Sequence, residues 1–266
     1  MSKVNEKPRK GKALVGIHAV VTGGARGIGF AVVAELLRQG AVVTAMGRDK
    51  TRLLGAKRRL SRLGTIKIET VDVTKELSVR RAFRRAVKAR GPVGILINNA
   101  GAAESAPLTR TSAKLWGDML GVNLTGAFLC SREVVSGMVK GGWGRIVTIA
   151  STAGLEGYPY VSAYCAAKHG AVGLARALAL ELKGSGVTVN AVCPHFTETD
   201  LLTESVRKVA EMTGQKPAAI RASYLRSMPY GRFVTPAEVA SVVEKLCVHP
   251  TATGRAVVVD GGKVKL

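Results

Sequence analysis

The sequence has few acidic and few aromatic residues. It holds 18 Asp and Glu against 40 Lys and Arg, a formal net charge of +22, and aromatic side chains make up 5% of it. Proteins that read nucleic-acid sequence carry recognisable finger, basic-zipper or basic-aromatic motifs, and none is present. We therefore expect no specific nucleic-acid partner and interpret the excess charge as solvated helix faces. Nonspecific nucleic-acid binding stays an alternative.

Long apolar runs are also missing. Gly, Arg or Lys interrupts every candidate before it reaches the roughly 18 residues that a membrane span needs. Residues 1–16 begin with basic side chains but lack the apolar stretch and small-residue cleavage site of a signal peptide. We expect a soluble, cytoplasmic protein without a membrane partner.

The cysteines and histidines are few and scattered. No CxxC pair and no metal-ligand spacing occurs among them. We expect reduced core thiols and no metal site. The residues concerned are Cys130, Cys165, Cys193, Cys247, His18, His169, His195 and His249.

Short apolar runs alternate with longer helical patterns along the 266 residues, of which 47% are hydrophobic. Continuous apolar runs are typical of parallel strands buried on both faces. The expected strands are 17–21, 41–45, 66–71, 95–97, 146–149, 187–192 and 256–259. The expected helices are 28–39, 49–63, 79–90, 113–140, 160–183 and 236–249. This order predicts one α/β domain over residues 13–266, a doubly wound parallel sheet of about seven strands flanked by helices, after a basic flexible tail at residues 1–12.

Two segments depart from this alternation. Residues 197–233 form an insertion with helical patterns at 199–213 and 217–228, which favours a small helical lid over the strand ends at 197–228. A peripheral helix pair is the alternative. The helix at 160–183 is apolar or small on nearly every side, so we expect one face to pack on the sheet and another on a second subunit.

A glycine-rich turn, TGGARGIG at residues 22–29, follows the first expected strand and enters a helix. Glycine lets a backbone approach a diphosphate, and the free N–H groups of the helix N-terminus face the anion. The turn therefore predicts a dinucleotide site.

The end of the second strand indicates which dinucleotide is bound. An NAD-binding chain places a carboxylate there, whereas this chain has Gly47 followed by Arg48. Arg26 in the glycine turn adds a second guanidinium, and paired Arg–phosphate contacts are strong. We favour NADP(H) over NAD(H), with Asp49 as a helix cap.

Tyr164 and Lys168 are four residues apart and thus one turn apart on one helix face. An ammonium beside a phenol favours the phenolate and lowers a pKa that is ordinarily about 10. Ser151 precedes this pair at the end of a strand, and the combination with the glycine turn argues against chance.

The ordered motifs TGGARGIG, DVT, NNAG, VNLTG, Ser151, YCAAK and VVVDGG resemble the classical short-chain dehydrogenase/reductase family, including its 3-oxoacyl thioester reductases and ketoreductases. The resemblance runs from Leu14 to Gly262. It implies a single Rossmann-like domain, assembled as a homotetramer or homodimer through the helices that carry Asn123 and Tyr164. It also implies hydride transfer between a nicotinamide and a ketone or secondary alcohol.

The resemblance assigns roles to four catalytic residues. Tyr164 would protonate the carbonyl oxygen, Lys168 would lower the pKa of Tyr164 and bind the nicotinamide ribose, and Ser151 would hydrogen-bond the carbonyl. Asn123 would hold a helix distortion and a water that feeds protons toward Lys168. The implied cofactor-binding residues are Gly23, Arg26, Gly27, Ile28, Gly29, Arg48, Asp72, Val73, Asn99, Ala100, Gly101, Tyr164, Lys168, Pro194, Thr197 and Thr199.

One position departs from the family pattern, because His195 follows Pro194 where the family usually has glycine. A backbone that needs positive φ would be strained by histidine. The substitution can be merely tolerated, can place the imidazole against the substrate, or can weaken the cofactor pocket.

The resemblance leaves the substrate open between a 3-oxoacyl-CoA thioester, a carrier-protein thioester and a free ketone. Five basic lid residues, Arg207, Lys208, Lys216, Arg221 and Arg226, could meet the phosphates of a CoA arm. The carrier-protein docking positions of the family fall at Ser136 and Ser185, which are uncharged. We expect NADP(H)-dependent reduction of a 3-oxoacyl-CoA-type or related ketone, with an NAD-dependent hydroxyacyl-CoA or alcohol dehydrogenase as the alternative.

Overall fold

A computed structural model describes residues 12–264, so the predicted tail, apart from Lys12, lies outside the described residues. The described chain forms an all-parallel sheet in the order β3-β2-β1-β4-β5-β6-β7. The predicted doubly wound, Rossmann-like sheet of about seven strands is confirmed. Its strands are β1 His18–Thr22, β2 Val42–Gly47, β3 Ile66–Thr70, β4 Ile95–Asn98, β5 Gly144–Ile149, β6 Val187–Pro194 and β7 Ala256–Val259.

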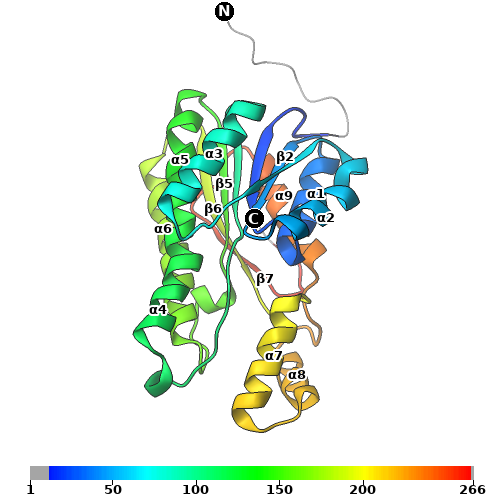
Figure 1. Ribbon diagram of the computed structural model, residues 1–266, viewed down its shortest axis with the longest axis vertical. Helices are drawn as coiled ribbons and strands as arrows, with labels where there is room; N and C mark the ends of the chain where they lie inside the picture. The colour runs from blue at the N-terminus through cyan, green and yellow to red at the C-terminus, as the bar shows by residue number, and fades with distance from the viewer. Residues whose placement is uncertain (1–11, 265–266) are drawn as a thin grey trace, which may run out of the picture.

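Helices cover both faces of the sheet (Figure 1). One face carries α1 Gly27–Arg38, α2 Lys50–Leu60 and α9 Pro236–Val248, and the other carries α3 Glu76–Arg90, α5 Gly126–Lys140 and α6 Ser162–Glu181. α4 Ala113–Leu120 packs beside α6. Among the described residues, no helix is both long and apolar enough to cross a membrane.

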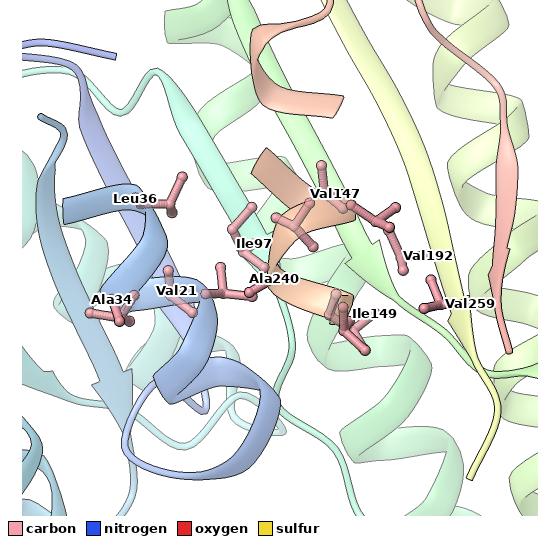
Figure 2. Close-up of a cluster of buried hydrophobic side chains, with 14 of the residues drawn as sticks. Val21, Ala34, Leu36, Ile97, Val147, Ile149, Val192, Ala240 and Val259 are labelled. Carbon is pink, nitrogen blue, oxygen red and sulfur yellow. The ribbon is translucent and has the colours of Figure 1, made fainter. Parts of the chain in front are cut away.

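Alternation along each strand supplies a hydrophobic core to both faces. Val20 and Val21 are both fully buried, yet they belong to the cores on opposite sides of the sheet. Figure 2 shows Leu36 of α1 and Ala240 of α9 packed over Val21 on one side. Each fully buried valine contributes about 1.5–3 kcal/mol of hydrophobic stabilisation. This burial fixes the strands relative to the helices, and the strand ends are fixed with them.

The helix predicted over 113–140 is interrupted by a π-helical turn at Gly121–Thr125. The cause is Asn123, whose Nδ2 donates to the Met119 carbonyl at 3.0 Å and to the Ala102 carbonyl at 2.9 Å. A side chain that bonds the backbone in this way competes with regular helix geometry. π-Helical turns are frequent at functional sites.

The predicted lid consists of α7 Asp200–Thr213 and α8 Pro217–Arg226, which lie together below the carboxyl ends of the strands in Figure 1. A parallel bridge between Thr197 and Val234 holds its base. Lys208 of α7 also donates to Glu104, in the segment after β4, at 2.6 Å. The insertion is therefore attached to the strand ends on two sides.

Candidate active site

The glycine turn between β1 and α1 is too tight for side chains. Gly23 and Gly27 have φ of +64° and +52°, in the left-handed region that favours glycine. A Cβ at Gly29 would lie 2.3 Å from the Gly23 carbonyl oxygen. The N-cap residue of α1, Arg26, makes no side-chain capping hydrogen bond, so the first N–H groups of the helix stay available to an anion. The turn therefore fits the diphosphate of a dinucleotide.

Asn99 and Ala100, after β4, hold this turn in place. Asn99 Nδ2 donates to the carbonyl oxygens of Thr22 at 2.9 Å and Gly23 at 3.2 Å. The Thr22 hydroxyl oxygen accepts from the N–H groups of Asn99 and Ala100, both at 3.0 Å. The NNAG motif thus positions the glycine turn through its side chain as well as its backbone.

The residues predicted to choose the cofactor lie at the ends of β1 and β2. Asp49 caps α2 by accepting the N–H of Arg52 at 3.0 Å, as predicted. Arg48 is exposed and has no carboxylate within 4 Å among the described residues. Arg26 instead pairs with Asp200, the first residue of α7, at 3.2 Å. The sequence did not indicate this pairing, because the two residues are 174 positions apart.

Arg48 also lies near Asp72, one of the residues that the resemblance implies for cofactor binding. Burial acts to raise the pKa of Asp72, but hydrogen bonds from Thr74 and the charges of Lys75 and Arg48 outweigh it and leave that pKa below its ordinary value. The Thr74 hydroxyl donates to the Asp72 carboxylate at 2.7 Å. Arg48 and Asp72 thus face the same end of the strands.

Ser151 follows β5, and Tyr164 and Lys168 lie on the first turns of α6. Lys168 is 5% exposed, and its Nζ donates to the Ile149 carbonyl at 2.8 Å. The same Nζ lies 5.6 Å from the centre of the Tyr164 ring. The carboxyl end of β5 and one face of α6 therefore bring the predicted serine, tyrosine and lysine together.

The Lys168 ammonium was expected to lower the pKa of Tyr164. In the protein alone that pKa is raised instead. Desolvation of the phenol by the surrounding protein raises the pKa of Tyr164 to about 12, although a hydrogen bond with Ser151 acts in the opposite direction. Burial lowers the pKa of Lys168 to about 8. The Lys168 ammonium is directed at the Ile149 carbonyl, and desolvation of the phenol outweighs any attraction from it.

Asn123 approaches the same cluster from the π-helical turn. A Cβ at Gly101 would lie 2.7 Å from Asn123 Oδ1 and 3.7 Å from Lys168 Nζ. These two polar atoms therefore converge above Gly101, and only glycine allows that approach. The backbone N–H of Ala102 also donates to Asn123 Oδ1 at 3.3 Å. Asn123 thus ties the segment after β4 to the helix beside Lys168.

His195 stands where the family usually has glycine, and its backbone is not strained. Tyr160 is the one non-glycine residue with positive φ among those described, so His195 has an ordinary backbone. Its Nδ1 accepts the N–H of Phe196 at 2.8 Å, which leaves the imidazole proton on Nε2. That Nε2 lies 3.4 Å from the Tyr158 hydroxyl, which donates to Glu156 at 2.8 Å.

The surroundings of His195 favour the neutral form of its imidazole. Burial lowers the pKa of His195, and the nearby carboxylates of Glu156 and Asp260 oppose this only in part. Protonation would also require Nδ1 to give up the bond from Phe196.

Aromatic side chains at the strand ends were missed by the sequence patterns. Phe196, after β6, stacks on Tyr224 of α8 with ring centres 4.2 Å apart and planes 6° apart. The Tyr158 ring meets the rings of His195 and Phe196 edge-on. No periodicity links these residues, because they come from three different segments.

Three of the five basic lid residues are already paired. Arg207 bonds to Glu204 and Glu211, Lys208 to Glu104, and Arg221 to Glu198. Lys216 and Arg226 have no carboxylate within 4 Å in the described chain. Less lid charge is thus available for a phosphorylated arm than the sequence indicated.

Comparisons with known proteins agree with this geometry. The family model for short chain dehydrogenase matches residues 17–210. The chain is 38% identical to granaticin polyketide synthase putative ketoacyl reductase 1 of Streptomyces violaceoruber, over 92% of both chains. It is 35% identical to a 3-oxoacyl-[acyl-carrier-protein] reductase of Aquifex aeolicus, over 94% of this chain and 98% of the relative.

A solved structure of an actinorhodin polyketide ketoreductase variant with NADPH superimposes with a TM-score of 0.88 at 34% identity. The match covers 92% of this chain and 96% of that one. The family model, the two relatives and the solved structure all match a part of this chain that includes the glycine turn and the cluster of Ser151, Tyr164 and Lys168. The chain therefore belongs to the short-chain dehydrogenase/reductase family and is an NAD(P)-dependent oxidoreductase.

Proposed function

We propose that the protein is an NADP(H)-dependent ketoreductase. The observation that carries the proposal is the meeting of Ser151, Tyr164 and Lys168 at the end of β5, beside a glycine turn that fits a diphosphate. A bound nicotinamide supplies the hydride in such a site. The protein's own task is then to orient a carbonyl group and to give its oxygen a proton.

Tyr164 is assigned the role of proton donor. With a pKa of about 12, its phenol keeps its proton at neutral pH and can release it to a carbonyl oxygen that gains negative charge. Ser151 hydrogen-bonds to the same phenol and would hold that oxygen from the other side. Lys168 is an ammonium below about pH 8 and supplies positive charge beside the phenolate as it forms. Asn123 is assigned a positioning role through its contacts above Gly101.

The preference for NADP(H) is supported by guanidinium groups near the glycine turn. Gly47 offers no carboxylate to a ribose, and Arg48 beside it has no described acidic partner. A shallow pocket next to the turn is lined by Arg26, Arg52 and Arg59, together with Asp200, which pairs with Arg26. Guanidinium groups pair with phosphate through two parallel hydrogen bonds, which suits a 2′-phosphate.

The proposed substrate is a 3-oxoacyl-CoA-type thioester or a related ketone. The relative from Aquifex aeolicus is named as a 3-oxoacyl-[acyl-carrier-protein] reductase, and the structural neighbour as a polyketide ketoreductase, so both names indicate reduction of a keto group. The Tyr158 hydroxyl lies 3.0 Å from that of Thr152, which follows Ser151, and the Tyr158 ring meets that of Phe196 edge-on. These two rings would offer an aromatic surface to an acyl chain or ring. The paired lid cations weaken the case for CoA phosphates and leave a free ketone as the nearest alternative.

A substrate panel with both cofactors tests the proposal. Acetoacetyl-CoA, a simple acetoacetate thioester and a set of cyclic ketones are each mixed with protein and NADPH or NADH, and loss of reduced cofactor is followed. We expect turnover with NADPH and at least one ketone. Faster turnover with NADH would favour the hydroxyacyl-CoA or alcohol dehydrogenase alternative. Bound NADPH that no ketone oxidises would contradict the enzymatic role.

We also propose a homodimer or homotetramer built on α5 and α6 and acting in the cytoplasm, as the sequence resemblance implies. Phe128 of α5 and Leu180 of α6 are large apolar side chains that are 42% and 76% exposed in the single chain. Light scattering coupled to size exclusion gives the state directly, and a monomer at micromolar concentration would contradict the assembly.

A further inference from the structure

Unpaired basic side chains gather around the outer strand of the sheet. β3 is an edge strand, with α2 packed toward one face of the sheet and α3 toward the other. Seven exposed residues of these elements and of the turn after α2 are here called the basic edge. They are Arg58, Arg62, Lys67, Arg80, Arg81, Arg84 and Lys88.

The charge of the basic edge is not compensated. None of its seven residues has a carboxylate within 4 Å among residues 12–264. Glu69 of β3 bonds to Arg85 at 2.7 Å, and so does not neutralise the basic edge. The lid differs, since Arg207, Lys208 and Arg221 all have acidic partners there.

α3 arranges its part of the basic edge as a stripe. Arg80, Arg84 and Lys88 are spaced by four residues, and Arg81 lies beside them, so they share one face of the helix. At 1.5 Å per residue the stripe is about 12 Å long. Like charges four residues apart repel one another in an isolated helix, and an external polyanion would relieve that repulsion.

The composition of this surface indicates which polyanion it suits. The one aromatic residue between positions 50 and 90 is Phe83, which is 2% exposed and belongs to the core. The surface therefore offers no ring to stack on unpaired bases and no aromatic anchor for a lipid bilayer. Leu77 and Val87 are its exposed apolar side chains on α3, ten residues apart.

Double-stranded nucleic acid matches a charge stripe without aromatic groups. A DNA duplex carries one negative charge per roughly 1.7 Å of its axis, counted over both strands. About 12 Å of duplex thus carries about seven phosphates, of which those on the near side face the stripe. Contacts of this kind depend on charge and not on base sequence. We propose that the basic edge binds the phosphate backbone of double-stranded nucleic acid without reading its sequence. This inference is independent of the proposed ketoreductase activity.

Anisotropy of two unrelated fluorescent 20-base-pair DNA duplexes, titrated with the full chain at several salt concentrations, tests the inference. We expect equal affinity for both sequences, with Kd of roughly 1–100 µM near physiological salt and a steep loss of affinity as salt rises. A variant carrying Arg80→Gln, Arg81→Gln, Arg84→Gln and Lys88→Gln should bind at least tenfold more weakly. The slope of log affinity against log salt should shrink by about three to four.

A matched control removes the same net charge elsewhere, through Lys140→Gln, Lys183→Gln, Lys245→Gln and Arg255→Gln. These four residues are exposed and also lack described acidic partners. The control should keep the affinity of the unchanged protein within about threefold, and thermal melting verifies that both variants are folded. Equal losses in the two variants, or no duplex binding at 50 mM salt, would overturn the inference. So would tighter binding to anionic phosphatidylserine vesicles that duplex DNA fails to compete away.

Discussion

The imidazole Nε2 of His195 lies 3.4 Å from the hydroxyl oxygen of Tyr158, and Tyr158 in turn donates to Glu156. His195 holds this position because its Nδ1 accepts the backbone N–H of Phe196. The imidazole is thereby directed toward the loop that follows Ser151. This geometry supports a substrate-side role for His195 among the interpretations that the sequence left open.

Replacing His195 with glycine should therefore affect the ketone more than the cofactor. We expect His195→Gly to raise KM for the best ketone several-fold while KM for NADPH changes less than twofold. Backbone freedom alone should lower stability by about 0.5–1 kcal/mol, because glycine loses more entropy on folding. His195→Asn is the matched control, since its side-chain oxygen can still accept from Phe196. Steady-state kinetics checks this, and a rise confined to the NADPH KM would place His195 against the cofactor.

Arg48 should determine the choice between the two cofactors. Hydrogen bonds to charged groups contribute about 1.5–3 kcal/mol, so Arg48→Asp should reduce kcat/KM for NADPH at least tenfold. The same change should leave or improve kcat/KM for NADH. Lys245→Asp, an equal charge change on α9, should leave the ratio of the two values unaltered. An unchanged ratio in Arg48→Asp would show that Arg48 does not contact the 2′-phosphate.

The ion pair between Arg26 and Asp200 should compete with NADPH. The two side chains are 3.2 Å apart and 55% and 73% exposed, and exposed ion pairs contribute about 0–1 kcal/mol. Asp200→Asn frees Arg26, so the Kd for NADPH should fall by up to about fivefold, with no change for NADH. Fluorescence titration of each cofactor measures this. Equal tightening for NADH would contradict competition at the 2′-phosphate.

The buried ammonium of Lys168 should make stability depend on pH. Its pKa is about 8 in the folded chain and ordinarily 10.5, so between these values the unfolded chain binds more protons. Stability should then rise with pH from about 8 to 10.5, by on the order of 3 kcal/mol for this group. Lys168→Met abolishes that contribution along with activity. Urea unfolding at pH 7 and 10 gives the free energy of unfolding of the unchanged protein and of Lys168→Met. The unchanged protein should gain stability relative to Lys168→Met between these two pH values. A constant difference would mean that Lys168 titrates normally.

The predicted strands agree with the structure to within about two residues at each end, because continuous apolar runs require burial on both faces. Periodicity gives no sign of the π-helical turn inside the helix predicted over 113–140, since that turn depends on bonds from Asn123 to Ala102 and Met119. Only the family resemblance implied a distortion there.

Other features of the site depend on contacts between distant segments. The pairing of Arg26 with Asp200 and the stacking of Phe196 on Tyr224 join residues from different elements. The pKa of Tyr164 is raised by the packed protein around it, which spacing along a helix does not reveal. Sequence patterns identify the chemical groups, whereas their charges and partners follow from packing.

The most direct test of the proposed chemistry compares Tyr164→Phe with the unchanged protein, using NADPH and the best ketone of the panel. The phenylalanine ring keeps the size and shape of the tyrosine ring at this position of α6 but has no proton to give. We predict that kcat falls at least a hundredfold, since general acid catalysis contributes about 10²–10⁴-fold. NADPH affinity, measured by fluorescence, should change less than threefold. Near-normal kcat in Tyr164→Phe would contradict the assignment of Tyr164 as the proton donor.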